Sequence, residues 1–119
     1  MMRQQRGTAQ RTSQDTGVRL LSLRVMPRVW EGLRQHVRKR GDVRNRIAEA
    51  LESANLNEIP LLRVDFSEGA EDTSCRVSKK LYKLVEDVAA KRGCSMNTLV
   101  NSAIAKLTLS PLDYKDLLG

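Results

Sequence analysis

The sequence LSLRV at Leu21–Val25 returns in altered form as TSCRV at Thr73–Val77, 52 residues later. In both stretches a serine and an arginine alternate with residues that suit a buried face. Because successive side chains of a strand point to opposite faces, this pattern predicts a short strand with one buried side in each copy. These two strands decide the fold, and the rest of the sequence repeats around them.

Each strand is followed by two amphipathic helices. The first helix of each copy ends in basic residues and a glycine, Gly41 or Gly93, which is a helix stop signal. Beyond the glycines the offset becomes 53 residues, so that Asp42 corresponds to Ser95. One strand with two helices is too small to bury its apolar faces alone, and two copies therefore predict two halves of one fold.

The repeat divides the chain into five segments. They are a flexible basic arm (1–17), a first strand–helix–helix unit (18–53), an acidic connector (54–70), a second unit (71–110) and a C-terminal tail (111–119). In the connector, Ile59-Pro60 breaks any helix, and the alternation of Leu62, Val64 and Phe66 predicts an extended stretch that packs on the core. The tail could add a final helical turn that packs on a neighbouring element.

Composition and charge narrow the class of protein. A chain of 119 residues with 40% hydrophobic and 3% aromatic residues fits a small helical fold. No apolar run is long enough to span a membrane, and two cysteines make no disulfide framework, so we expect a cytoplasmic protein without membrane contact. The net charge is +7, with +7 in residues 1–53, −4 in 54–72 and +4 in 73–119. Basic units around an acidic connector favour a polyanionic partner such as nucleic acid.

The order of strand, helix, glycine turn and helix, with Ser95-Met96-Asn97 opening the last helix, resembles the ribbon-helix-helix family of the Arc, MetJ and CopG type. Members are normally homodimers in which each subunit gives one strand to an antiparallel ribbon that enters the DNA major groove. Two units on one chain imply an intramolecular pseudo-dimer, a tandem layout similar to that of TraY-like conjugation accessory proteins. The fold class we expect is therefore mainly α, with two tandem units around one two-stranded antiparallel ribbon.

The first unit departs from the family pattern. Its glycine turn is one residue shorter, Met26 stands where a polar cap is usual, and Leu20 falls on the outward face. By the repeat, Leu20 corresponds to Asp72, which an antiparallel ribbon brings near Arg24. Three roles are open to Asp72: it could hold Arg24, accept a hydrogen bond from cytosine, or repel phosphate; we favour the first.

If the apolar side of each strand is buried, the ribbon turns the same residue types toward the groove in both copies. We expect Ser22, Arg24, Ser74 and Arg76 to contact bases, because arginine suits guanine O6 and N7 and serine can donate or accept. The resemblance places phosphate at the start of the second helix of each unit, which assigns phosphate contacts to Arg44, Arg46, Ser95, Met96 and Asn97. The arm residues Arg3, Arg6 and Arg11 could add non-specific attraction.

Chemistry other than binding is not indicated. His36 is the only histidine. We expect Cys75 to be a small apolar residue of a strand and Cys94 to lie in a turn, so we expect no metal and no cofactor. No nucleophile–base pair, carboxylate pair or phosphate loop stands out, and we expect no enzyme activity. Trp30 and Tyr82 are related by the repeat, and we expect them to close the core rather than stack on bases.

These observations favour sequence-specific binding of double-stranded DNA through the ribbon. The protein would act as a transcriptional repressor, or as an accessory protein in conjugation or plasmid DNA processing, in which case a relaxase is a possible partner. Small modules bury little surface, so cooperative self-association on adjacent sites is expected. Two alternatives stay open: an antitoxin that binds a toxin partner, and a protein-interaction module that uses the ribbon without DNA.

Overall fold

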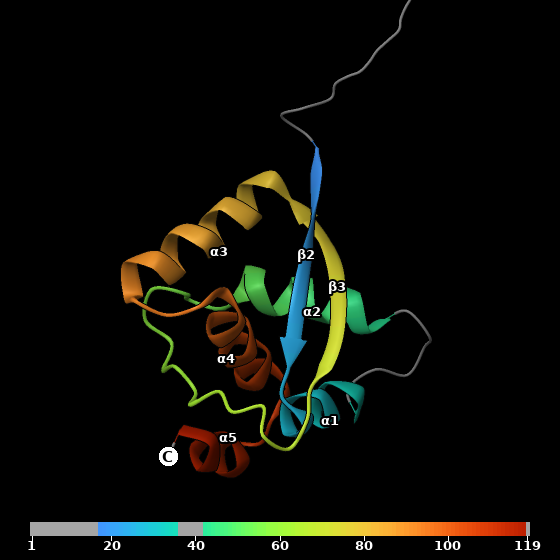
Figure 1. Ribbon diagram of the computed structural model, residues 1–119, viewed down its shortest axis with the longest axis vertical. Coiled ribbons are helices and arrows are strands. Elements are labelled where there is room, and N and C mark those ends of the chain that lie inside the picture. The colour runs from blue at the N-terminus through green and yellow to red at the C-terminus, as the bar shows by residue number, and fades with distance from the viewer. Residues whose placement is uncertain (1–16, 36–41, 119) are drawn as a thin grey trace, which may run out of the picture.

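The computed structural model describes residues 17–35 and 42–118. Their elements, in chain order, are β2 (Val18–Val25), α1 (Pro27–Gln35), α2 (Asp42–Ser53), β3 (Glu71–Ser78), α3 (Lys79–Arg92), α4 (Met96–Thr108) and α5 (Pro111–Leu118). The two strands form a single antiparallel ribbon (Figure 1). The expectation of a mainly α fold with a two-stranded antiparallel ribbon is therefore confirmed for the described residues.

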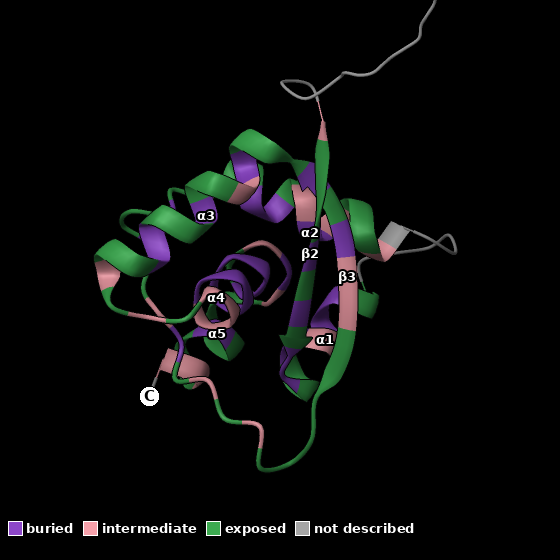
Figure 2. Ribbon diagram, turned by 45° about the horizontal axis from the view of Figure 1, so that its top comes forward, coloured by how far each residue is buried: buried purple, intermediate pink, exposed green. Residues whose placement is uncertain are grey.

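The ribbon has one buried and one outward face. Leu21, Leu23 and Val25 of β2 are buried, as are Cys75 and Val77 of β3, and the residues between them are mostly exposed (Figure 2). The alternation read from the sequence is thus confirmed over the centre of each strand. Thr73 differs from the expectation, since it is only half-buried although its partner across the ribbon, Leu23, is buried.

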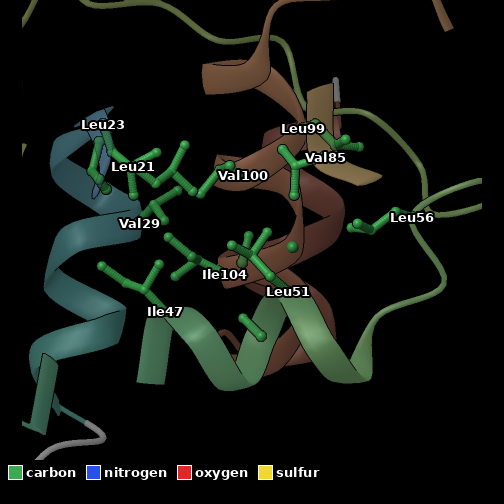
Figure 3. Packing of buried hydrophobic residues seen from close by; sticks show 14 of the residues in the cluster. Leu21, Leu23, Val29, Ile47, Leu51, Leu56, Val85, Leu99, Val100 and Ile104 are labelled. Atoms are coloured by element: carbon green, nitrogen blue, oxygen red, sulfur yellow. The ribbon is translucent and has the colours of Figure 1, made fainter. Parts of the chain in front are cut away.

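The helix α4 is the centre of the core. It packs against β2, α1, α2 and α3, and its Leu99, Val100 and Ile104 have no exposed surface. Figure 3 shows how side chains from β2, α1 and α2 converge on this helix. The strand β2 and the helices α1, α2 and α3 therefore all lose contacts if α4 moves.

The helices of the second unit begin and end where the sequence predicts. The Ser78 hydroxyl caps α3 by accepting a hydrogen bond from the Leu81 amide at 3.0 Å. Gly93 ends that helix in a left-handed conformation with φ 69°, which glycine adopts at no steric cost. Ser95 then caps α4. The corresponding stop of the first unit, around Gly41, lies outside the described residues.

The connector is part of the core. Its side chains Leu56, Ile59 and Leu62 are buried, although it forms no regular helix or strand. The amide of Leu62 donates to the Ser102 hydroxyl of α4 at 2.9 Å, which replaces a strand partner for this stretch. The tail forms more than the expected turn, because α5 is a helix whose buried Tyr114 donates its hydroxyl to the Pro60 carbonyl at 3.3 Å.

Candidate nucleic-acid interface

The centre of the outward face of the ribbon is built from three cross-strand pairs in which all residues except Leu20 are polar or charged. These pairs are Leu20 with Arg76, Ser22 with Ser74, and Arg24 with Asp72. All are exposed except Ser74, which is half-buried. All four residues predicted to contact bases thus lie on this face, two on each strand.

Arg24 is held through both its side chain and its main chain. Its Nε donates to Asp72 Oδ1 at 3.1 Å, and its guanidinium carbon lies 5.9 Å from the centre of the Phe66 ring. Its main-chain N–H donates to Asn97 Oδ1 at 3.0 Å. Of the roles that the sequence left open for Asp72, the structure therefore shows that it pairs with Arg24.

The opposite end of the ribbon is built differently. There Arg76 lies across from Leu20, whose surface is 59% exposed. An apolar side chain that stays this open on a surface is suited to contact another apolar group, and a thymine methyl is one such group. The two arginines of the ribbon consequently have different neighbours, one a carboxylate and the other a leucine.

An open hollow of about 630 Å³ joins the ribbon to the first turns of two helices. Its walls include Ser22, Arg24 and Ser74 from the strands, Arg44 from α2 and Asn97 from α4. The start of a helix offers unpaired N–H groups and the positive end of its dipole. The surface therefore places groups suited to bases and groups suited to phosphate beside one another.

At the start of α4, the side chains mainly serve the fold. The Ser95 hydroxyl accepts from the Thr98 amide at 3.1 Å and donates to Thr98 Oγ1 at 3.0 Å. Asn97 uses its side-chain oxygen to hold the main chain of Arg24, and Met96 is half-buried. Phosphate binding at this end would hence rely on the main-chain N–H groups of the first turn, before Thr98.

At the start of α2, the two predicted arginines differ in their contacts. Arg46 is half-buried, and its Nη1 lies 2.6 Å from Glu49 Oε1. Arg44 is exposed beside the ribbon, where it borders a recess shared with Ser74, Cys75 and Arg76. Arg44 is thus the better placed of the two for a phosphate. The predicted arm contacts Arg3, Arg6 and Arg11 lie outside the described residues.

Burial and charge act in opposite directions on Cys75. Burial raises the pKa of its thiol above the ordinary value of 9.0, and the positive charge of Arg44 offsets part of that rise. A neutral, buried thiol behaves as a small apolar side chain. This is the strand-filling role that the sequence indicated.

The sequence analysis missed Asn101, which fixes the end of β2. This buried side chain accepts from the Met26 amide at 2.9 Å and donates to the carbonyls of Arg24 and Asn97 at 3.0 and 2.7 Å. A signal was present, because Asn101 and Ser102 interrupt an otherwise apolar run on the inner face of a helix. Buried polar side chains are normally paired, so such an interruption predicts a specific partner.

Other kinds of site are not found in the described part of the chain. Over residues 17–35 and 42–118, no group of three His, Cys, Asp or Glu residues is arranged to hold a metal ion. None of the helices described combines the length and apolar character needed to cross a membrane. The chain matches no protein-family model, no curated protein and no solved structure.

Proposed function

We propose that the chain is a ribbon-helix-helix pseudo-dimer that binds duplex DNA by placing β2 and β3 in the major groove. The observation that carries this proposal is the strand register, in which Ser22 lies opposite Ser74. These two residues are also equivalent in the repeat, since 74 − 22 = 52. A twofold axis between them would exchange β2 with β3, which is the relation expected of two fused copies.

The chemistry of the outward face supports direct reading of bases. A two-stranded ribbon has the width that the major groove admits, and arginine and serine can bond there to base edges. The hollow beside the ribbon adds Arg44 and the first turn of α4, which suit phosphates on either side of a groove. Such contacts fix the position of a protein on DNA, and the ribbon supplies the sequence preference.

Sequence-specific binding of duplex DNA would serve one of two biological roles. A repressor would block a promoter, and a conjugation or plasmid accessory protein would organise DNA for processing. In both roles, several copies on adjacent sites would raise the affinity that one ribbon supplies. The groove-reading step is common to both roles, so it is the step to test first.

Selection of bound duplexes from a random pool, followed by fluorescence anisotropy on the selected site, tests the proposal. Arg76→Ala should cost about 1–3 kcal/mol of binding free energy and relax base preference at one position. Lys91→Ala removes the same charge from an exposed site in the last turn of α3 and serves as the matched control. We expect that variant to weaken binding slightly and equally on all sequences.

Failure to select any preferred sequence would argue against base reading. Equal behaviour of the Arg76 and Lys91 variants would do the same, because only bulk charge would then matter. If the ribbon instead serves protein contacts, as an interaction module or an antitoxin would use it, the purified protein would show no binding to duplex DNA at moderate salt. Co-purification of one defined partner would then replace DNA as the ligand.

A further inference from the structure

The two ends of the ribbon carry different chemistry although the repeat makes them equivalent. The repeat aligns Leu20 with Asp72, and the register pairs each with an arginine: Leu20 with Arg76, and Asp72 with Arg24. One end therefore presents an arginine beside a carboxylate, and the other an arginine beside an exposed leucine. A ribbon of identical copies could not show this difference.

Asp72 restricts the position of the Arg24 side chain but occupies only one of the hydrogen-bond donors of its guanidinium. The contact at 3.1 Å engages Nε, and the two Nη groups have no hydrogen-bond partner among the residues that the structure describes. A guanidinium offers paired donors in a rigid fork, so these Nη groups suffice for the two acceptors of guanine. The main chain of Arg24 is also fixed, since Asn97 binds its N–H and Asn101 binds its carbonyl.

An arginine that is already positioned loses less side-chain entropy when it binds, and it adapts less readily to a wrong base. The carboxylate adds a penalty of its own, because a base that displaces Arg24 leaves Asp72 facing the groove without its cation. Discrimination can arise from such a penalty as well as from attraction. At the other end, nothing among the described residues bonds to the Arg76 side chain, and Leu20 offers only apolar contact.

We propose that Asp72 is a positioning residue that makes the Arg24 end of the ribbon the stricter reader of guanine. The Arg76 end tolerates more substitutions and gains from a thymine methyl beside Leu20. The preferred site is then asymmetric, and the protein binds it in one orientation. This inference rests on the proposed function, since it assumes that the ribbon lies in the major groove.

The experiment is a base-substitution scan of the selected site, with binding measured by competition anisotropy. Scans with Arg24→Ala and Arg76→Ala first identify the guanine that each arginine reads. In the wild type we expect substitution of the Arg24 guanine to weaken binding by on the order of a hundredfold, and of the Arg76 guanine by about tenfold. Asp72→Asn should reduce the loss of affinity on substituting the Arg24 guanine to about tenfold. The loss on substituting the Arg76 guanine should stay unchanged.

Glu71→Gln is the matched control, because Glu71 is the exposed neighbour of Asp72 and loses the same charge. We expect it to raise affinity slightly on all sequences without changing either penalty. The double exchange Leu20→Asp with Asp72→Leu moves the carboxylate to the Arg76 end. The larger loss of affinity should then occur on substituting the guanine that Arg76 reads. Circular dichroism confirms that each variant is folded before its scan is interpreted.

The outcomes separate this inference from the proposed function. If the wild type binds no duplex in preference to others, the proposed function fails and the role of Asp72 fails with it. If the wild type selects a site but Asp72→Asn behaves like Glu71→Gln, the ribbon reads DNA and Asp72 does not position Arg24 for reading. A palindromic selected site with equal penalties at both guanines would also overturn the inference.

Discussion

Replacing Asn101 with alanine removes the side chain that joins the end of β2 to α4. The side-chain oxygen accepts from the Met26 amide, and the side-chain nitrogen donates to the carbonyls of Arg24 and Asn97. Met26 is 5% exposed and Asn101 is 1% exposed, so water cannot readily replace the lost partner of the Met26 amide. The substitution therefore leaves a buried donor unpaired.

The magnitude follows from the contacts. A buried donor without a partner costs about 1–3 kcal/mol, and each hydrogen bond lost elsewhere adds about 1 kcal/mol. The Asn97 carbonyl lies inside α4 and keeps the helical bond from its i+4 neighbour, so its loss is small. We expect a decrease of about 2–4 kcal/mol in the free energy of unfolding, with part of it from the emptied volume.

Urea unfolding followed by circular dichroism measures this decrease. With a slope of about 1–2 kcal/mol per molar for a small domain, the midpoint should fall by about 2 M. Lys106→Ala, an exposed position on the same helix, is the control and should change the midpoint little. A loss below about 1 kcal/mol for Asn101→Ala would refute the reasoning, since the Met26 amide would then have found another partner.

Three further predictions concern other parts of the fold. Ser95→Ala removes the cap of α4 and should lower the free energy of unfolding by about 1 kcal/mol, measured by thermal melting. Cys94 is half-buried and Cys75 is buried, so a thiol reagent should modify Cys94 in the native protein and Cys75 only after unfolding, as mass spectrometry would show. Burial raises the pKa of Cys75 above its unfolded value, so the stabilisation from the buried neutral thiol is complete below pH 9.0. This stabilisation is lost as the pH rises through the folded pKa. In urea titrations, Cys75→Ala should flatten this alkaline decline in the free energy of unfolding.

Local patterns predicted the elements well because the forces that shape them act over a few residues. The alternation around Arg24 and Arg76 depends only on which face of a strand is buried, and the caps at Ser78 and Ser95 depend on the next turn of helix. The position of Asp72 beside Arg24 also followed from the sequence, because the repeat and an antiparallel ribbon together define the register. None of these inferences required knowledge of how the helices pack on the ribbon.

Other features depended on contacts between distant segments and could not be read in the same way. The connector alternates like a strand at Leu62 and Phe66, yet the hydroxyl of Ser102, 40 residues away, takes the Leu62 amide that a strand partner would have taken. The sequence predicted that Asn97 contacts phosphate, yet its side-chain oxygen accepts a hydrogen bond from the Arg24 main chain. In both cases a polar side chain of α4 forms a hydrogen bond with a distant segment. The local sequence pattern cannot predict such a bond, because it depends on which segments the fold brings together.

The path of the connector explains why Arg24 and Arg76 have different neighbours at the two ends of the ribbon. After α2, the chain buries Leu56 and Leu62 beside α4 and then enters β3 at the end of the ribbon where Arg24 lies (Figure 1). It brings Phe66 and Asp72 to that arginine and supplies nothing to Arg76. A pair of separate, identical subunits would place the same neighbours at both ends. If the chain is a fused pair that reads DNA, as proposed above, its two halves are free to differ, and the halves of its DNA site need not match.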